Sequence, residues 1–98
     1  MGYLSDVLRN EYSNLEVREV YSSKLGDTDV EIVEVSSGGE KFIAMFQSNP
    51  VKNGIYKWSL IITSSHNTRT IKGMDRINSI NLALRSSIEA MLKGIKGE

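Results

Sequence analysis

The side chains that could do chemistry are few, and the only histidine lies beside two serines. His66 follows Ser64 and Ser65, so a hydroxyl nucleophile with an imidazole base is one interpretation. Adjacent residues of a tight turn point apart, however, and the surrounding sequence lacks the strand-to-helix elbow that activates serine. The chain has no cysteine, which excludes thiol nucleophiles, disulfides and Cys-rich metal sites, and one histidine does not supply a typical His-based metal centre. We therefore expect a protein that is not an enzyme and that needs no cofactor or metal.

Paired carboxylates and glycine-rich loops are the other common catalytic signatures. Glu31 and Glu34 are an odd number of positions apart, which places them on opposite faces of a strand and prevents them from acting as a close pair. We interpret both as residues that keep a strand soluble and protect its edge. Gly38 and Gly39 are typical of a hairpin turn, and no spaced glycines with a lysine precede a helix as in a phosphate-binding loop. Nucleotide hydrolysis is therefore not predicted.

Cationic side chains with aromatic residues between them are the remaining candidates for function. Single-stranded nucleic acids are commonly held in a positive groove in which bases stack on aromatic rings. The carboxy-terminal half carries such a set, and the predicted nucleic-acid-binding residues are Lys52, Lys57, Arg69, Lys72, Arg76, Tyr56 and Trp58. A competing interpretation puts Tyr56 and Trp58 in the core, because they share one face of a predicted strand with Leu60 and Ile62.

Charge is balanced over the whole chain but not along it. The 98 residues include 12 Lys and Arg and 12 Asp and Glu, a formal net charge of +0. Residues 1–40 carry nine acids and three bases, and residues 41–98 carry nine bases and three acids, so the halves have net charges of −6 and +6. This segregation indicates either an acidic and a basic face or two halves whose charges interleave where they pack. The neutral total favours a protein partner, because sequence-blind nucleic-acid binders usually carry a basic excess.

The hydrophobic pattern predicts an α+β fold in one domain that spans residues 1–98. Apolar residues at helical spacing predict a short amphipathic helix over residues 4–15 and a long helix from Asp75 to the carboxy-terminal end. Runs rich in β-branched and aromatic residues predict four to five antiparallel strands joined by hairpins, at residues 16–22, 29–35, 41–47, 55–63 and 68–72. We expect both helices on one face of this sheet. The layout is similar in outline to that of the coactivator-like small single-strand binding proteins, without a shared residue motif.

Three connections complete this arrangement. Residues 23–28 are predicted to form the first turn, since they contain Gly26 and Asp27. Residues 48–54 contain Asn-Pro and Asn-Gly dipeptides, which predict a surface loop between two strands. The segment 68–72 is short enough for an edge strand that pairs with 55–63, and this pairing would bring the predicted basic residues close together.

The predicted second and third strands are apolar on both faces, although the helices can cover only one. The residues that suggest this are Val33, Val35, Ile43, Met45, Ile55 and Ile61. An exposed apolar patch of several hundred square ångströms is unusual on a monomer, so we expect a homodimer or a protein partner to cover the second face. No apolar run is long enough to cross a membrane and the first residues do not resemble a secretory signal, which favours a soluble cytoplasmic protein without a membrane partner.

Two functions are consistent with these observations. The first is a small non-enzymatic module that binds nucleic acid, in particular single-stranded DNA or RNA, or that regulates through such binding. The alternative is a protein–protein interaction module, such as a homodimeric adaptor or inhibitor, that uses the uncovered face of the sheet. The local cluster of basic residues favours the first function, and the neutral total charge favours the second.

Overall fold

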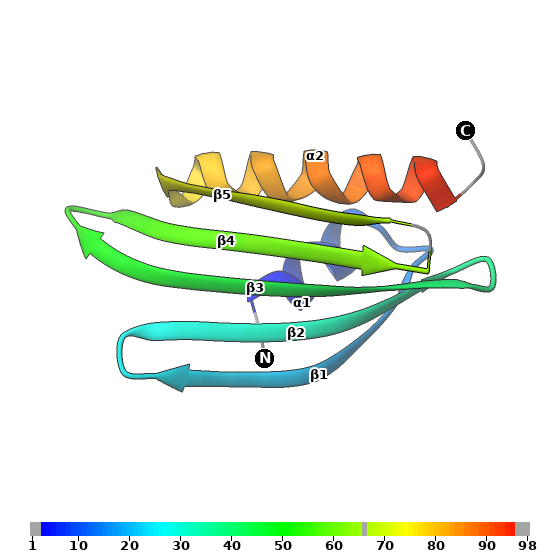
Figure 1. Cartoon of the computed structure of the whole chain (residues 1–98), viewed down its shortest axis with the longest axis horizontal. Helices are drawn as coiled ribbons and strands as arrows, with labels where there is room; N and C mark the ends of the chain where they lie inside the picture. Colours follow the sequence, from blue (N-terminus) through cyan, green and yellow to red (C-terminus); the bar gives the residue numbers. More distant parts are fainter. Residues whose placement is uncertain (1–2, 66, 96–98) are drawn as a thin grey trace.

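The protein is an antiparallel sheet with a helix before it and a helix after it. The computed structural model describes residues 3–65 and 67–95, so the interpretation of His66 lies outside the described residues. The elements are, in chain order, α1 (Tyr3–Glu11), β1 (Glu16–Leu25), β2 (Thr28–Ser37), β3 (Glu40–Lys52), β4 (Ile55–Ser64), β5 (Thr68–Arg76) and α2 (Ile77–Ile95). The five strands follow one another across the sheet in the order β1-β2-β3-β4-β5 (Figure 1). The predicted α+β class and hairpin-built sheet are confirmed.

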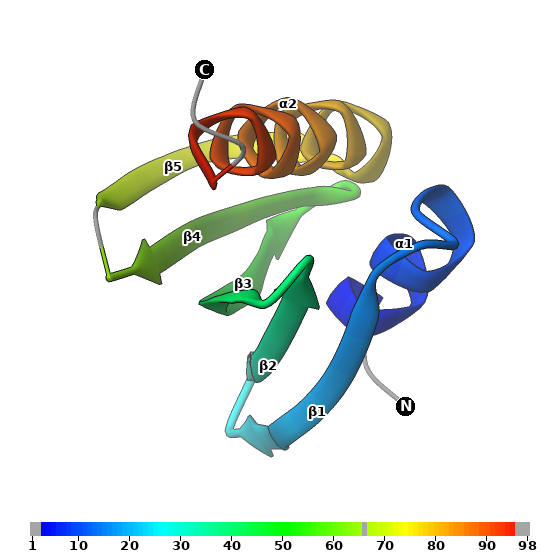
Figure 2. The same ribbon diagram turned by 90° about the vertical axis from the view of Figure 1, so that its right-hand side faces the viewer.

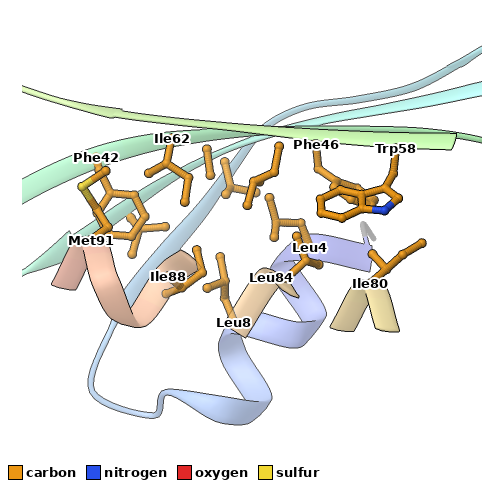
Figure 3. Packing of buried hydrophobic residues seen from close by; sticks show 14 residues of the cluster. Leu4, Leu8, Phe42, Phe46, Trp58, Ile62, Ile80, Leu84, Ile88 and Met91 are labelled. Atoms are coloured by element: carbon orange, nitrogen blue, oxygen red, sulfur yellow. The ribbon is translucent and has the colours of Figure 1, made fainter. Parts of the chain in front are cut away.

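Both helices pack on the same face of the sheet, as predicted (Figure 2). Helix α1 contacts β1 and β2, and helix α2 contacts β4 and β5. The core between the layers consists of buried apolar side chains from both helices and from the three central strands: Leu4, Leu8, Val33, Val35, Phe42, Ala44, Phe46, Trp58, Leu60, Ile62, Ile80, Leu84, Ile88 and Met91 (Figure 3). Trp58 is only 4% exposed, which confirms the competing interpretation that places it in the core. Neither described helix has both the length and the apolar content that a membrane span requires.

The predicted surface loop at residues 48–54 is wrong, because strand β3 continues through most of it. Asn49 and Pro50 pair with Lys57 and Tyr56 of β4. The strand tolerates the proline because the register shifts directly after Pro50, and such irregularities are where a missing N–H does least harm to a ladder. Only Asn53 and Gly54 remain as a turn, with φ of 52° and 77°, the left-handed pair that suits a tight hairpin.

Strand β5 is longer than predicted, and α1 is shorter. β5 pairs with β4 from Thr68 to Arg76, so α2 begins at Ile77 and not at Asp75. The indole Nε1 of Trp58 donates to Asp75 Oδ2 at 2.9 Å, a bond that holds the end of this strand in the sheet. Helix α1 ends at Glu11, and the chain turns back into β1 through a bond from the Leu15 amide to the Tyr12 carbonyl.

The amino-terminal end of α1 is held by a buried carboxylate from the sheet. The backbone amides of Leu4 and Ser5 donate to the two carboxylate oxygens of Glu31, at 2.6 and 2.9 Å, and Glu31 is 5% exposed. The first amides of a helix have no partner within it, and the positive end of the helix dipole favours an anion. Glu31 and Glu34 lie on opposite faces of β2 as predicted, but the interpretation of Glu31 as a solubilising residue is wrong, because it is buried against α1.

The opposite end of α1 is tied to α2 by polar side chains. The Tyr12 hydroxyl donates to Glu89 Oε2 at 3.3 Å and lies 3.4 Å from the Arg85 carbonyl, while Arg85 pairs with Glu11 at 3.3 Å. Burial, together with the Glu89 carboxylate, raises the pKa of Tyr12 to about 12. The two helices are thus joined to each other as well as to the sheet.

Replacing Glu31 by Gln removes the charge that holds α1 and turns an amide N–H group toward one of the helix amides. We expect Glu31→Gln to lower the free energy of unfolding by about 1–3 kcal/mol, measured by urea denaturation. Glu34→Gln is the matched control, because the same change on the other face of the same strand removes only the surface ion pairs with Arg18 and Lys41. Equal stability of the two variants would contradict the role given to Glu31.

The raised pKa of Tyr12 predicts a loss of stability at high pH. Above pH 10 an unfolded chain releases the phenol proton, whereas the folded protein keeps it until the pH approaches 12, so stability falls across this interval. Tyr12→Phe should abolish the part of this fall that Tyr12 causes, as measured by urea denaturation at pH 9 to 11. An identical pH dependence in the variant and the parent protein would refute this explanation.

Candidate nucleic-acid interface

The face of the sheet that the helices leave uncovered, here called the open face, carries most of the basic charge. Strand alternation and register assign the side chains to it. Among the described residues, the charged side chains on this face are six cations and two carboxylates, a net charge of +4: Arg18, Lys41, Lys52, Lys57, Lys72, Arg76, Glu16 and Glu34. Since the whole chain is neutral, the rest of the molecule has a net charge of −4. Charge is therefore separated between faces.

Two of these cations share one carboxylate. Arg18 donates to Glu34 at 3.0 Å, and Lys41 lies 3.7 Å from the other oxygen of the same carboxylate. The hydrogen bond from Arg18, with the charges of Arg18 and Lys41, holds the pKa of Glu34 below its usual value. This end of the open face is consequently a mixed-charge surface rather than a basic one.

The other four cations, here called the basic corner, gather at the opposite end of the face. The basic corner consists of Lys52, Lys57, Lys72 and Arg76. Lys57 pairs with Met74, so Lys72 and Arg76 are its two diagonal neighbours on β5, at a separation of about 7–8 Å. Ile55 pairs with Lys52 on one side and with Arg76 on the other, so these two cations lie on either side of it. Arg76 Nη1 donates to the Asn53 carbonyl at 2.9 Å. Within the part of the chain that the structure describes, no carboxylate lies within ion-pair distance of these four side chains.

A groove of about 730 Å³ runs across the strands at the basic corner. The open-face side chains that line it are hydroxyls, amides, two ammonium groups and one thioether: Thr28, Gln47, Asn49, Lys57, Ser59, Lys72 and Met74. Ser48, Trp58 and Gly73, whose side chains alternate to the helix-covered face, complete the lining. None of the described lining residues is acidic. Ammonium groups bind phosphates without regard to sequence, whereas amides and hydroxyls can both donate to and accept from base edges.

The structure brings together four of the seven residues predicted to bind nucleic acid. Arg69 pairs with Ile62, whose side chain is in the core, so Arg69 extends from the other face at the far end of β5. Tyr56 and Trp58 also face the helices, where Tyr56 is half-buried and Trp58 packs 6.3 Å from the Phe46 ring. No aromatic residue of the predicted set is therefore available on the open face for stacking.

The groove also contains residues that sequence reasoning missed. Gln47 and Asn49 reach it because β3 extends beyond its predicted end, and Ser59 lies between Lys57 and Ile61 in the alternation of β4. The alternation with a period of two, which places Lys57 on the face opposite Trp58, also places Gln47 and Ser59 on that face. It could not be used for Asn49, because residues 48–54 were predicted to be a loop.

A second cavity lies on the helix-covered side, between the beginnings of α1 and α2. It has a volume of about 460 Å³, and its lining includes the rings of Tyr3, Phe46 and Tyr56 together with the carboxylates of Asp29 and Glu31. Both oxygens of Glu31 already accept amides, and Asp29 pairs with Lys24 at 3.5 Å. The described residues contain no group of three or more histidine or acidic side chains that could hold a metal ion. This cavity is therefore less suited to an anion than the groove.

The floor of the groove depends on Gly73. A Cβ atom at this position would lie 2.9 Å from Asp75 Oδ2 and 3.4 Å from the indole Nε1 of Trp58. Gly73→Ala should push the carboxylate away and break the indole bond, at a cost of about 1–3 kcal/mol. The measurement is the indole N–H resonance, with urea denaturation. Asp75→Asn keeps an acceptor and should shift that resonance less, whereas an unchanged resonance in Gly73→Ala would contradict this packing.

Comparisons of the chain with protein-family models, with curated proteins and with solved structures found no match. The interpretation of the groove depends on its own geometry and charge.

Proposed function

We propose that this domain is a non-enzymatic module that binds single-stranded nucleic acid in the groove at the basic corner. The observation that carries the proposal is the concentration of four cations, none in an ion pair with a described carboxylate, around a groove whose described lining has no acidic residue. The neutral charge of the whole chain favours a protein partner over nucleic-acid binding. Separation of charge between faces weakens that objection, because a polyanion approaching the open face meets a net charge of +4.

The groove suits a single strand better than a duplex. Duplex DNA is read mainly by a helix or a two-stranded ribbon that enters the major groove, whereas this surface is the face of a sheet. A single strand can place its phosphates on the basic corner while its unpaired bases reach the amides of Gln47 and Asn49. Base stacking contributes about 1–3 kcal/mol per base where aromatic residues provide it, and the open face of this groove offers none from the predicted set. Binding should therefore be modest and strongly dependent on salt.

The test is binding of a fluorescent single-stranded oligonucleotide over a range of salt concentrations. Four phosphate contacts predict a slope of log affinity against log salt of about −3, since each contact on a single strand contributes about 0.7. The double variant Lys57→Ala with Lys72→Ala should halve the slope and weaken binding of all sequences alike, because phosphate contacts carry no base information.

A matched control removes the same amount of charge from the rest of the molecule. Arg69→Ala with Lys93→Ala deletes two exposed cations away from the open face, and we expect it to keep most of the slope. No binding at low salt, or equal losses in the two double variants, would end the proposal.

One observation favours protein interaction as a second candidate function. Aliphatic side chains that are only partly buried continue across the open face from β2 to β4, so this surface has an apolar centre next to its basic corner. Nucleic acid does not require such a centre, whereas a protein interface does.

A further inference from the structure

The apolar centre of the open face includes a row of side chains that crosses all five strands. Tyr21 pairs with Ile32, Ile32 with Met45, Met45 with Ile61, and Ile61 with Thr70. The three middle side chains are partly buried, and Tyr21 is 44% exposed. We call these five residues the central row. A band of this kind on a sheet face that no described helix covers is typical of a surface that is buried in an assembly.

The order of residues in the central row is nearly the same from either end. It has Met45 in the middle, an isoleucine on each side, and Tyr21 and Thr70 at the ends. A two-fold axis along β3 would place Met45 on Met45 of a second copy and Ile32 on Ile61 of that copy. In an isologous contact residue i of one copy meets residue j of the other and j meets i, so here apolar side chains of similar size would meet at each of these positions.

We propose that a second copy of this chain covers the open face about this axis, forming a sandwich of two five-stranded sheets with the helices outside. Sheets in sandwiches lie about 10 Å apart with strand directions within about 30°, which keeps the residues near the axis opposed. Five strands of about ten residues present a face of about 800 Å², comparable with the area that each partner buries in a stable complex.

The distribution of charge supports the same arrangement. The acidic half of the chain forms α1, β1 and β2, and the basic half forms most of β3 with β4, β5 and α2. Rotation about an axis along β3 places the β1–β2 side of one copy opposite the β4–β5 side of the other. On the open face, the β1–β2 side carries Glu16, Arg18 and Glu34 and the β4–β5 side carries Lys57, Lys72 and Arg76, so a side of net charge −1 comes opposite a side of net charge +3. Opposed charges of this kind orient the partners as they meet.

The second copy would also occupy the groove. Lys57 and Lys72 lie on the same face as the central row, Lys72 two residues from Thr70 along β5 and Lys57 four residues from Ile61 along β4. A second copy and a nucleic acid therefore compete for one surface, so the dimer is a form in which the groove is closed. This competition rests on the proposed function, whereas the dimer itself does not.

The dimer is tested without nucleic acid, by sedimentation of the full chain at increasing concentration. We expect a mass approaching twice 10.9 kDa at tens of micromolar. Met45→Glu places two like charges together at the axis and should weaken association about 100-fold or more. Leu82→Glu is the control, because Leu82 is 59% exposed on α2 and away from the open face. Circular dichroism of both variants establishes that they are folded.

The absence of cysteine allows a direct test of the axis. Met45→Cys gives a single thiol per chain, and a short bismaleimide should join two copies, since sheets about 10 Å apart leave the thiols too far from each other for a direct disulfide. Leu82→Cys should not be joined. A monomer at all concentrations, or a dimer that survives Met45→Glu, would overturn the proposed interface.

Competition is then measured by adding the oligonucleotide to the dimer. We expect the mass per protein complex to fall to that of one chain with one oligonucleotide as the groove is filled. A complex that keeps two chains would overturn the competition. If no oligonucleotide binds, but the parent protein dimerises and the Met45→Glu variant does not, the proposed function fails and the proposed interface stands.

Discussion

Coverage of the sheet on one side only is the constraint on which the rest of this structure depends. Two helices supply apolar side chains to one face, and the period of two then assigns each strand residue to the core or to the open face. Glu31 contributes to this one-sided coverage. Its buried carboxylate fixes the end of α1 over β2 and so helps to close the core on that side. Ile61 and Ile62 are neighbours in the chain, yet one lies on the open face and the other is fully buried.

Much of this fold could be predicted from local pattern. The stripes of α1 and α2, the hairpin at Gly38 and Gly39, and the burial of Trp58 follow from spacing that depends on neighbours in the sequence. The predictions that were wrong concern residues whose tertiary contacts override the local conformational preference of the sequence. Asn49 and Pro50 suggest a loop, but β4 offers a partner strand and the register shift accommodates the proline. Glu31 suggests a solvated residue, and only the position of α1 reveals the amides that it accepts.

The candidate site could also be predicted in part from local pattern. Lys57, Lys72 and Arg76 converge because β4 and β5 pair as a hairpin, and the sequence indicates that pairing. Arg69 differs from Lys72 by an odd number of positions, so it lies on the other face, a distinction available from the period of two alone. The net charge of the open face depends on the register of all five strands, and a sum over the sequence conceals it.

A methyl NMR titration with a single-stranded oligonucleotide tests whether the open face is the binding surface. Isoleucine and methionine methyls occur on both faces of the molecule, with Ile61 and Met45 on the open face and Ile62 and Met91 in the core. Binding at the open face should shift the resonances of Ile61 and Met45, while those of Ile62 and Met91 change little. Shifts confined to the helices, or none at saturating oligonucleotide, would contradict it.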